Sequence, residues 1–135
     1  MAASESDISG LSNGKINSES EEIVDLLVSL GTDLNTAKTV ICLHTHGPSK
    51  SICLQEKCEL RQPDVSIAIS KLKELGIVKI LPTSIEGRGR PSHTYELSVP
   101  LNEALNPFRE QASKRLSVIK NQLTRLNELT DSVSN

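Results

Sequence analysis

The sequence predicts a mainly α-helical domain that carries a small β-hairpin and ends in a long C-terminal helix. Aliphatic residues recur at spacings of three and four along most of the chain, which is the period of an amphipathic helix. The period changes to two in one region, around residues 77–97, as expected for two short strands. Aromatic residues make up only 1% of the sequence, so the core must be built from leucine, isoleucine and valine.

The charge is unevenly distributed and suggests three parts. The chain has 135 residues and a net charge of −2, but residues 1–34 carry −6, residues 35–99 carry +3 and residues 100–135 carry +1. Residues 1–17, rich in serine, glycine, asparagine and acid, fit no helical or strand period and are expected to form a disordered tail. We therefore expect one folded domain at 18–99, followed by a C-terminal helix at 100–135.

Several features favour a cytoplasmic protein without a membrane segment. No basic segment followed by an apolar stretch opens the chain, and no apolar run approaches the ~20 residues of a spanning helix. The odd set of three cysteines cannot be fully paired within one chain, which agrees with a reducing compartment.

Two helices are predicted before the glycines at positions 31 and 47. The first begins near Ser18 or Ser20 and presents an apolar stripe of Ile23, Leu26, Leu27 and Leu30. The second begins with Asn35 as its N-cap and ends before Gly47-Pro48. Its apolar face is expected to hold Ala37, Val40, Ile41 and His44.

Two further helices are predicted to follow in close succession. A short one follows Ser51 and turns Leu54 and Cys58 inward. After a turn at residues 59–61, the next helix has Pro63 in its first turn, where a missing amide hydrogen is tolerated, and ends at Gly76. Its buried stripe is expected to be Val65, Ala68, Ile69, Leu72 and Leu75.

Strands are predicted at 77–81 and 93–98, joined by a loop of turn-forming and basic residues. Asn106-Pro107 then predicts the start of a last helix, which runs to about Asp131. Helices, a hairpin and a long terminal helix in this order predict a winged helix-turn-helix.

The stretch 54–78 and the hairpin resemble the MarR, ArsR and TrmB families of winged-helix regulators. The resemblance lies in Gln62-Pro63, Val65-Ser66, Ile69, Leu72 and Gly76-Ile77-Val78, and in a wing of Gly87-Arg88-Gly89-Arg90-Pro91 followed by Tyr95-Glu96-Leu97. It covers residues 35–99 and implies a DNA-binding transcription regulator. Two positions depart from the pattern: Gln55, where these families usually have a small residue, and Cys58, where they usually have leucine.

The outward face of the helix after Pro63 carries side chains that suit the major groove. Serine and glutamine can hydrogen-bond base edges, isoleucine can contact a thymine methyl group, and lysine suits a phosphate or a guanine. The predicted DNA-binding residues of this helix are Gln62, Asp64, Ser66, Ile67, Ser70 and Lys71. The alternative is a solvated face on which Ile67 is an ordinary exposed residue.

The loop between the strands adds a second predicted contact. Arg88 and Arg90, flanked by Gly87 and Gly89, form a basic tip that can lie along the narrow minor groove of A·T-rich DNA. The alternative is an ordinary exposed hairpin tip, in which glycine and arginine are common.

The terminal helix has an apolar stripe that a monomer would leave exposed. We expect it to pair with the same helix of a second copy through Phe108, Ala112, Leu116, Ile119, Leu123 and Leu126. Two heads would then read half-sites about 10 base pairs apart or a multiple of that. The alternative is that the helix folds back on its own domain.

Metal binding and catalysis are not expected. The spacing of Cys42, His44, His46, Cys53 and Cys58 does not match the paired ligands of structural zinc. No phosphate-binding loop, acid and base pair or activated nucleophile is evident, so neither a cofactor nor an enzyme activity is predicted.

The sequence therefore predicts a homodimeric regulator that binds double-stranded DNA, with its effector, if it has one, unknown. Two other hypotheses about its function stay open. One is a winged-helix module for protein interaction in a transcription or chromosome-associated assembly, and the other is a redox- or metal-responsive repressor.

Overall fold

The computed structural model describes residues 18–82 and 93–134. The predicted tail 1–17 and the predicted hairpin tip, with Arg88 and Arg90, lie outside the described residues. In chain order the elements are α2 (Ser18–Ser29), α3 (Leu34–His46), β1 (Ser49–Lys50), α4 (Ser51–Cys58), α5 (Gln62–Glu74), β2 (Val78–Pro82), β3 (His93–Leu97), α6 (Leu101–Ala104) and α7 (Asn106–Ser134).

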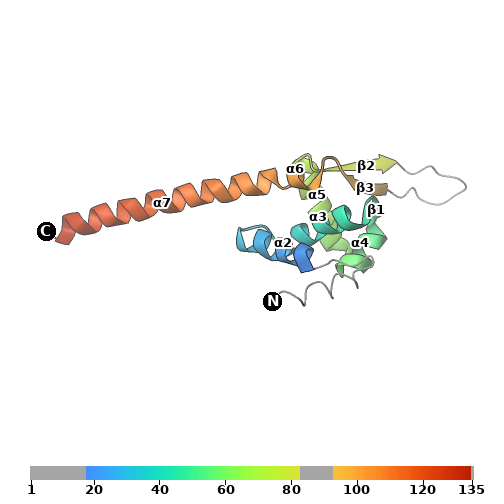
Figure 1. Cartoon of the computed structure of the whole chain (residues 1–135), viewed down its shortest axis with the longest axis horizontal. Coiled ribbons are helices and arrows are strands. Elements are labelled where there is room, and N and C mark those ends of the chain that lie inside the picture. Colours follow the sequence, from blue (N-terminus) through green and yellow to red (C-terminus); the bar gives the residue numbers. More distant parts are fainter. Residues whose placement is uncertain (1–17, 83–92, 135) are drawn as a thin grey trace, which may run out of the picture.

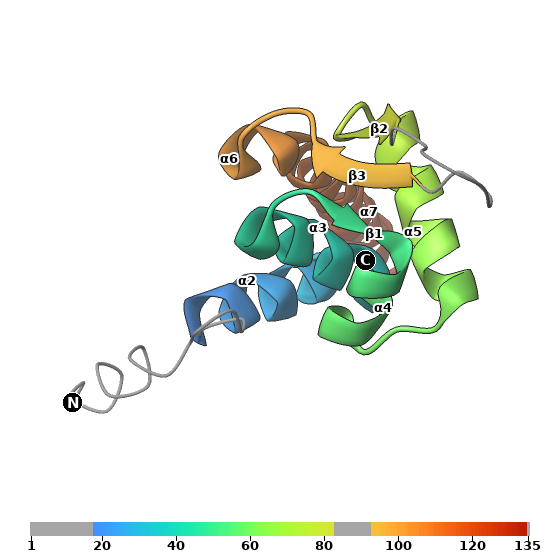
Figure 2. The ribbon, with the colours of Figure 1, turned by 90° about the vertical axis from the view of Figure 1, so that its right-hand side faces the viewer.

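The molecule consists of a head, formed by α2 to α6, and the helix α7 that projects from it (Figure 1). Figure 2, viewed towards the head along the direction of α7, shows α3 in the middle, with α2, α4, α5 and the sheet around it. No helix in the described part of the chain is both long and apolar enough to cross a membrane.

The sheet has three antiparallel strands in the order β1-β3-β2. Tyr95 of β3 lies opposite Ile80 of β2 on one side and Ser49 of β1 on the other. The hairpin of β2 and β3 confirms the predicted strands, whereas β1 was not predicted. A strand of two residues is too short to show an alternating pattern, so periodicity could not reveal it.

The core of the head is aliphatic, as predicted. Leu54, Leu72 and Ile41 are fully buried, and Cys58 also points inward, so the inward faces expected for α3, α4 and α5 are largely confirmed. Leu75 is an exception, because its side chain is 39% exposed at the C-cap of α5. His44 was wrongly placed on the apolar face of α3 and is exposed.

The predicted apolar stripe of α2 is partly wrong. Val24 and Leu27 are the buried residues, whereas Leu26 and Leu30 are about half exposed. The predicted stripe had the correct period but was rotated around the helix, because the side of α2 that faces the core carries Val24 and Leu27.

The N-cap of α3 is Asp33 and not Asn35 as predicted. Both carboxylate oxygens of Asp33 accept hydrogen bonds from Thr36: its hydroxyl lies 2.9 Å from each oxygen, and its amide lies 3.1 Å from Oδ2. The helix consequently begins at Leu34, and Thr36 is buried beneath the cap.

The short helix α6, which was not predicted, connects the sheet to α7. Ala104, Leu105 and Phe108 are buried in the core of the head, so the first turn of α7 belongs to the head. Arg109 fixes this junction, since its guanidinium donates hydrogen bonds to the carbonyl of Asn102 and to the side chains of Asn102 and Asn106.

Candidate nucleic-acid interface

The helices α4 and α5 form the predicted helix-turn-helix. Glu59 ends α4 in the left-handed conformation, with φ of 57°, and the amide of Leu60 donates to the carbonyl of Gln55 at 3.0 Å. Arg61 is then extended and Pro63 lies in the first turn of α5. This tight connection fixes α5 at an angle to α4, with its N-terminal turn facing solvent.

The outward face of α5 carries most of the residues that were predicted to contact DNA. Gln62, Ser66 and Ser70 are spaced by four along one exposed stripe, and Ile67 beside them is 59% exposed. Asp64 is different, because it is half-buried and lies 3.7 Å from the guanidinium of Arg61. The structure thus presents uncharged hydrogen-bonding groups and one apolar side chain to solvent.

Lys71, also predicted to contact DNA, is engaged with the head. Its ammonium lies 2.7 Å from Oδ1 of Asp33, the N-cap of α3. Burial raises the pKa of Asp33, but hydrogen bonds from Lys71 and Thr36 outweigh that effect, so the pKa of this carboxyl is below its ordinary value. A lysine held in this way is less available to a phosphate or a base than the sequence suggested.

The base of the wing is described and its tip is not. Lys79 on β2 and Glu96 on β3 lie opposite each other, with 3.7 Å between the ammonium and the carboxylate. The predicted minor-groove residues Arg88 and Arg90 lie beyond these strands, outside the described residues.

The long helix α7 presents an apolar stripe beyond the head. Leu116, Ile119, Leu123 and Leu126 are each between 53% and 58% exposed, and Ala112 is half-buried. Phe108 was predicted to belong to this stripe, but it is only 7% exposed and packs inside its own head. It is therefore not available to a second copy, and the stripe available for pairing begins after it.

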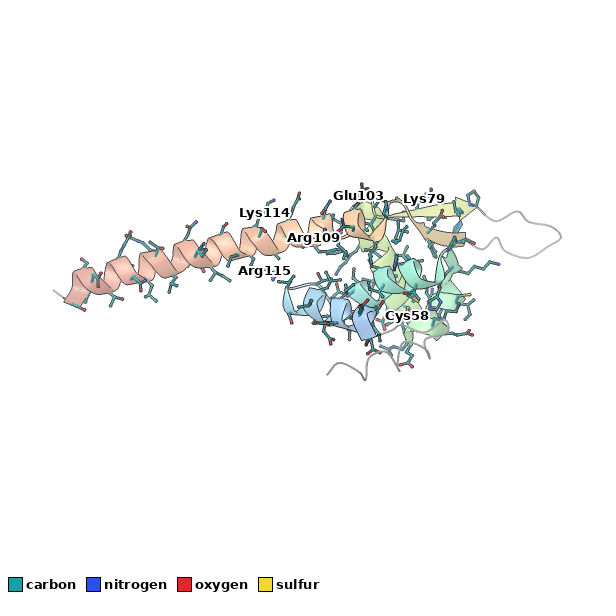
Figure 3. The ribbon with its side chains drawn as sticks, viewed as in Figure 1. Cys58, Lys79, Glu103, Arg109, Lys114 and Arg115 are labelled. Carbon is teal, nitrogen blue, oxygen red and sulfur yellow. The ribbon has the colours of Figure 1, made fainter. Side chains whose placement is uncertain are left out.

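The three cysteines are free thiols that lie at different depths in the head. Cys42 and Cys58 are buried between α3 and α4, and Cys53 is half-buried (Figure 3 labels Cys58). A hydrogen bond with Cys58 lowers the pKa of Cys42, while the same bond and burial raise the pKa of Cys58. Within residues 18–82 and 93–134, no group of three or more potential metal ligands comes together.

A hollow of about 270 Å³ lies between the head and the start of α7. It is bordered by the turn from α2 to α3, by the C-terminal half of α5 and by the first turns of α7. Its lining residues are Gly31, Thr32, Asp33, Thr36, Lys71, Glu74, Leu75, Phe108 and Gln111.

Comparison with solved structures identifies the architecture. NadR in complex with 4-hydroxyphenylacetate matches with a TM-score of 0.51 and 16% identity, over 84% of this chain and 80% of that one. A possible transcriptional regulator from Methanosarcina mazei Go1 matches with a TM-score of 0.53 and 13% identity, over 76% and 86%. The fold is a winged helix-turn-helix.

TrmBL2, an archaeal chromatin protein with a novel mode of DNA binding, also matches. Its TM-score is 0.52 at 19% identity, over 82% of this chain but only 42% of that one. The winged helix-turn-helix fold that the predicted resemblance implies is thus confirmed. No family model matches the chain, and no curated protein matches it in sequence.

Sequence reasoning missed the residues at the junction of the head and α7. Arg115 of α7 donates a hydrogen bond of 3.2 Å to the carbonyl of Leu30, next to Gly31. The Asp33–Thr36 spacing was a usable N-cap signal. No local pattern links Arg115 to a carbonyl 85 residues earlier in the chain.

Proposed function

We propose that the chain is a transcription regulator that binds double-stranded DNA sequence-specifically as a homodimer, and that it is not an enzyme. In this proposal α5 enters the major groove, and Arg88 and Arg90 of the wing enter the minor groove. The observation that carries it is the outward face of α5, on which Gln62, Ser66, Ile67 and Ser70 are exposed while the opposite face is anchored in the core.

The chemistry of this face suits base edges better than phosphates. Amide and hydroxyl groups can donate to or accept from any base, and an exposed isoleucine complements the methyl group of thymine. Lys71 is paired with Asp33 and Asp64 is paired with Arg61, so this proposal gives the base contacts to the four uncharged side chains. Arginine side chains of the wing supply the phosphate and minor-groove contacts instead.

The stripe on α7 supports the homodimer. A helix of 29 residues is about 43 Å long, and most of this one projects beyond the head (Figure 1). Leucine and isoleucine side chains that are half exposed along one face are best covered by a second copy of the same helix. Two copies related by a two-fold axis would present two α5 helices to a palindromic site.

Selection from a pool of random-sequence duplexes tests the proposal. The parent chain is compared with an Arg88→Ala, Arg90→Ala variant at two salt concentrations. A Lys114→Ala, Lys120→Ala variant is the matched control, since it loses the same charge from α7. The parent is expected to enrich a two-fold-related site, and the wing variant to lose affinity and show a shallower salt slope than the control.

The rival function gives different results. A winged-helix module that binds an acidic protein would enrich no sequence from the pool, and both double variants would weaken DNA binding equally. That outcome would overturn the proposed function. A monomer that nevertheless selects a single half-site would overturn only the homodimer.

A further inference from the structure

The turn between α2 and α3 contacts both α5 and α7. Residues 30–33 lie against α5 through Asp33 and against α7 through the carbonyl of Leu30. These contacts join segments that lie 38 and 85 residues apart in the sequence. The turn is therefore placed between the helix proposed to read DNA and the helix proposed to join two copies.

In the contact with α5, the residue contributed by the turn is held in place. The carboxylate of Asp33 is held by Thr36 as the N-cap of α3, so the position of its oxygens is fixed by the backbone of the head. Lys71 of α5 donates to Oδ1 of this fixed carboxylate at 2.7 Å. The C-terminal half of α5 is thereby tied to the start of α3.

The contact with α7 depends on a glycine. Gly31 has φ of +114°, which favours glycine, and a Cβ atom there would overlap the guanidinium of Arg115. Arg115 consequently lies directly against the backbone and donates to the carbonyl of Leu30 at 3.2 Å. In Figure 3 its side chain extends from α7 towards α2, whereas the neighbouring Lys114 points to the other side.

We infer that Arg115, Gly31, Asp33 and Lys71 are positioning residues that set the angle between α5 and α7. Phe108 anchors the base of α7 in the core, and Arg115, about two turns further along the helix, holds a second point of it against the head. A helix fixed at two points along its axis cannot swing about the first. In a dimer this angle sets the distance between the two recognition helices, and hence the spacing of the half-sites. The consequence for DNA rests on the proposed function, but the angle itself does not.

The contacts are suited to positioning more than to stability. The side chains of Asp33 and Lys71 are 46% and 51% exposed. Exposed ion pairs contribute little to the free energy of unfolding, so their removal is expected to leave the head folded. Loss of a defined angle without loss of folding distinguishes a positioning role from a structural one.

Double electron-electron resonance measures the distance between two spin labels on one chain, and this distance changes with the angle between α5 and α7. Labels are placed at Lys73→Cys on α5 and at Asn121→Cys on the face of α7 opposite its apolar stripe, with Cys53→Ser to remove the half-buried thiol. Labelled protein is diluted with unlabelled protein, so that only distances within one chain are observed. The measurement therefore works for a monomer and a dimer alike.

Arg115→Ala is expected to broaden and shift the distance distribution while the unfolding midpoint in urea stays close to that of the parent. Arg115→Lys, which keeps one donor for the carbonyl of Leu30, is expected to restore much of the narrow distribution. Arg125→Ala is the matched control, because Arg125 pairs with Glu128 on the same helix at 3.2 Å. Asp33→Asn keeps an N-cap residue but removes the charge that holds Lys71, and is expected to broaden the distribution as well.

A second measurement connects the angle to DNA. With half-site spacing varied one base pair at a time, the parent is expected to prefer one spacing and Arg115→Ala to lose that preference. A distribution in Arg115→Ala as narrow and as centred as in Arg125→Ala would overturn the inference, whatever the DNA result. A broadened distribution in a chain that selects no DNA site would instead refute the proposed function and leave the positioning role standing.

Discussion

Replacing Ile67 by alanine is expected to weaken DNA binding without weakening the fold. The side chain is 59% exposed in the free protein, so its truncation leaves no cavity, and the free energy of unfolding should change by less than about 0.5 kcal/mol. Against a thymine, each methyl group removed from water contributes about 0.8 kcal/mol. The loss of one such contact corresponds to a reduction in affinity of roughly fourfold.

A double-mutant cycle isolates this contact. The parent and Ile67→Ala are each titrated, by fluorescence anisotropy, with the selected site and with sites in which deoxyuridine replaces single thymines, which removes only the methyl group. The parent should lose roughly fourfold at one position of each half-site, and the variant should be insensitive there. Deoxyuridine outside the half-sites is the control.

The same titrations can refute a contact between Ile67 and a thymine methyl group. If the parent and Ile67→Ala lose the same affinity at every deoxyuridine position, Ile67 does not contact a thymine methyl group. If the variant also binds the unmodified site as tightly as the parent does, Ile67 is an ordinary exposed residue with no role in recognition.

Three further outcomes follow from other parts of the structure. Leu123→Asp should convert a dimer to a monomer in sedimentation analysis and leave the circular dichroism unchanged, whereas Asn121→Asp, at an exposed position, should leave both the dimer and the circular dichroism unchanged. Phe108→Ala should lower the free energy of unfolding in urea by about 3–5 kcal/mol, because it empties part of the core of the head. The pKa of Asp33 is lowered in the folded chain, so its stabilising contribution is complete at neutral pH and is lost as the pH falls through the folded pKa, below the ordinary value of 3.8. Between pH 7 and pH 3, urea titrations should show a larger loss of stability in the parent than in Asp33→Asn, which keeps the other paired carboxylates. An equal loss in both would contradict this prediction.

The local parts of the fold could be predicted because their signals are local. Pro63 and Gly76 mark the ends of α5, and the spacing of Val65, Ala68, Ile69 and Leu72 defines its buried face. The hairpin followed from alternation on two segments of adequate length. Leu75 broke the pattern because it lies at the C-cap, where the last turn leaves the core surface.

The surroundings of some predicted site residues depend on tertiary packing, which local sequence patterns do not show. Phe108 lies in phase with Ala112 and Leu116, and spacing alone cannot show that the head covers the first turn of α7 and leaves the later ones bare. Spacing also could not show that Asp33 lies beside Lys71. In both cases a residue with the predicted local geometry has a partner distant in sequence.

The placement of charge separates selectivity from affinity in the proposed complex. Gln62, Ser66, Ile67 and Ser70 carry no charge, and the ammonium of Lys71 is paired with the carboxylate of Asp33. Contacts made by uncharged groups release no counterions, so added salt should weaken binding to all sequences while the ratio between a selected and a random site changes little. The steep part of the salt dependence must then come from phosphate contacts elsewhere, of which the wing is the first candidate. A selectivity ratio that fell in step with affinity would assign base recognition to charged residues, and α5 would lose its central role.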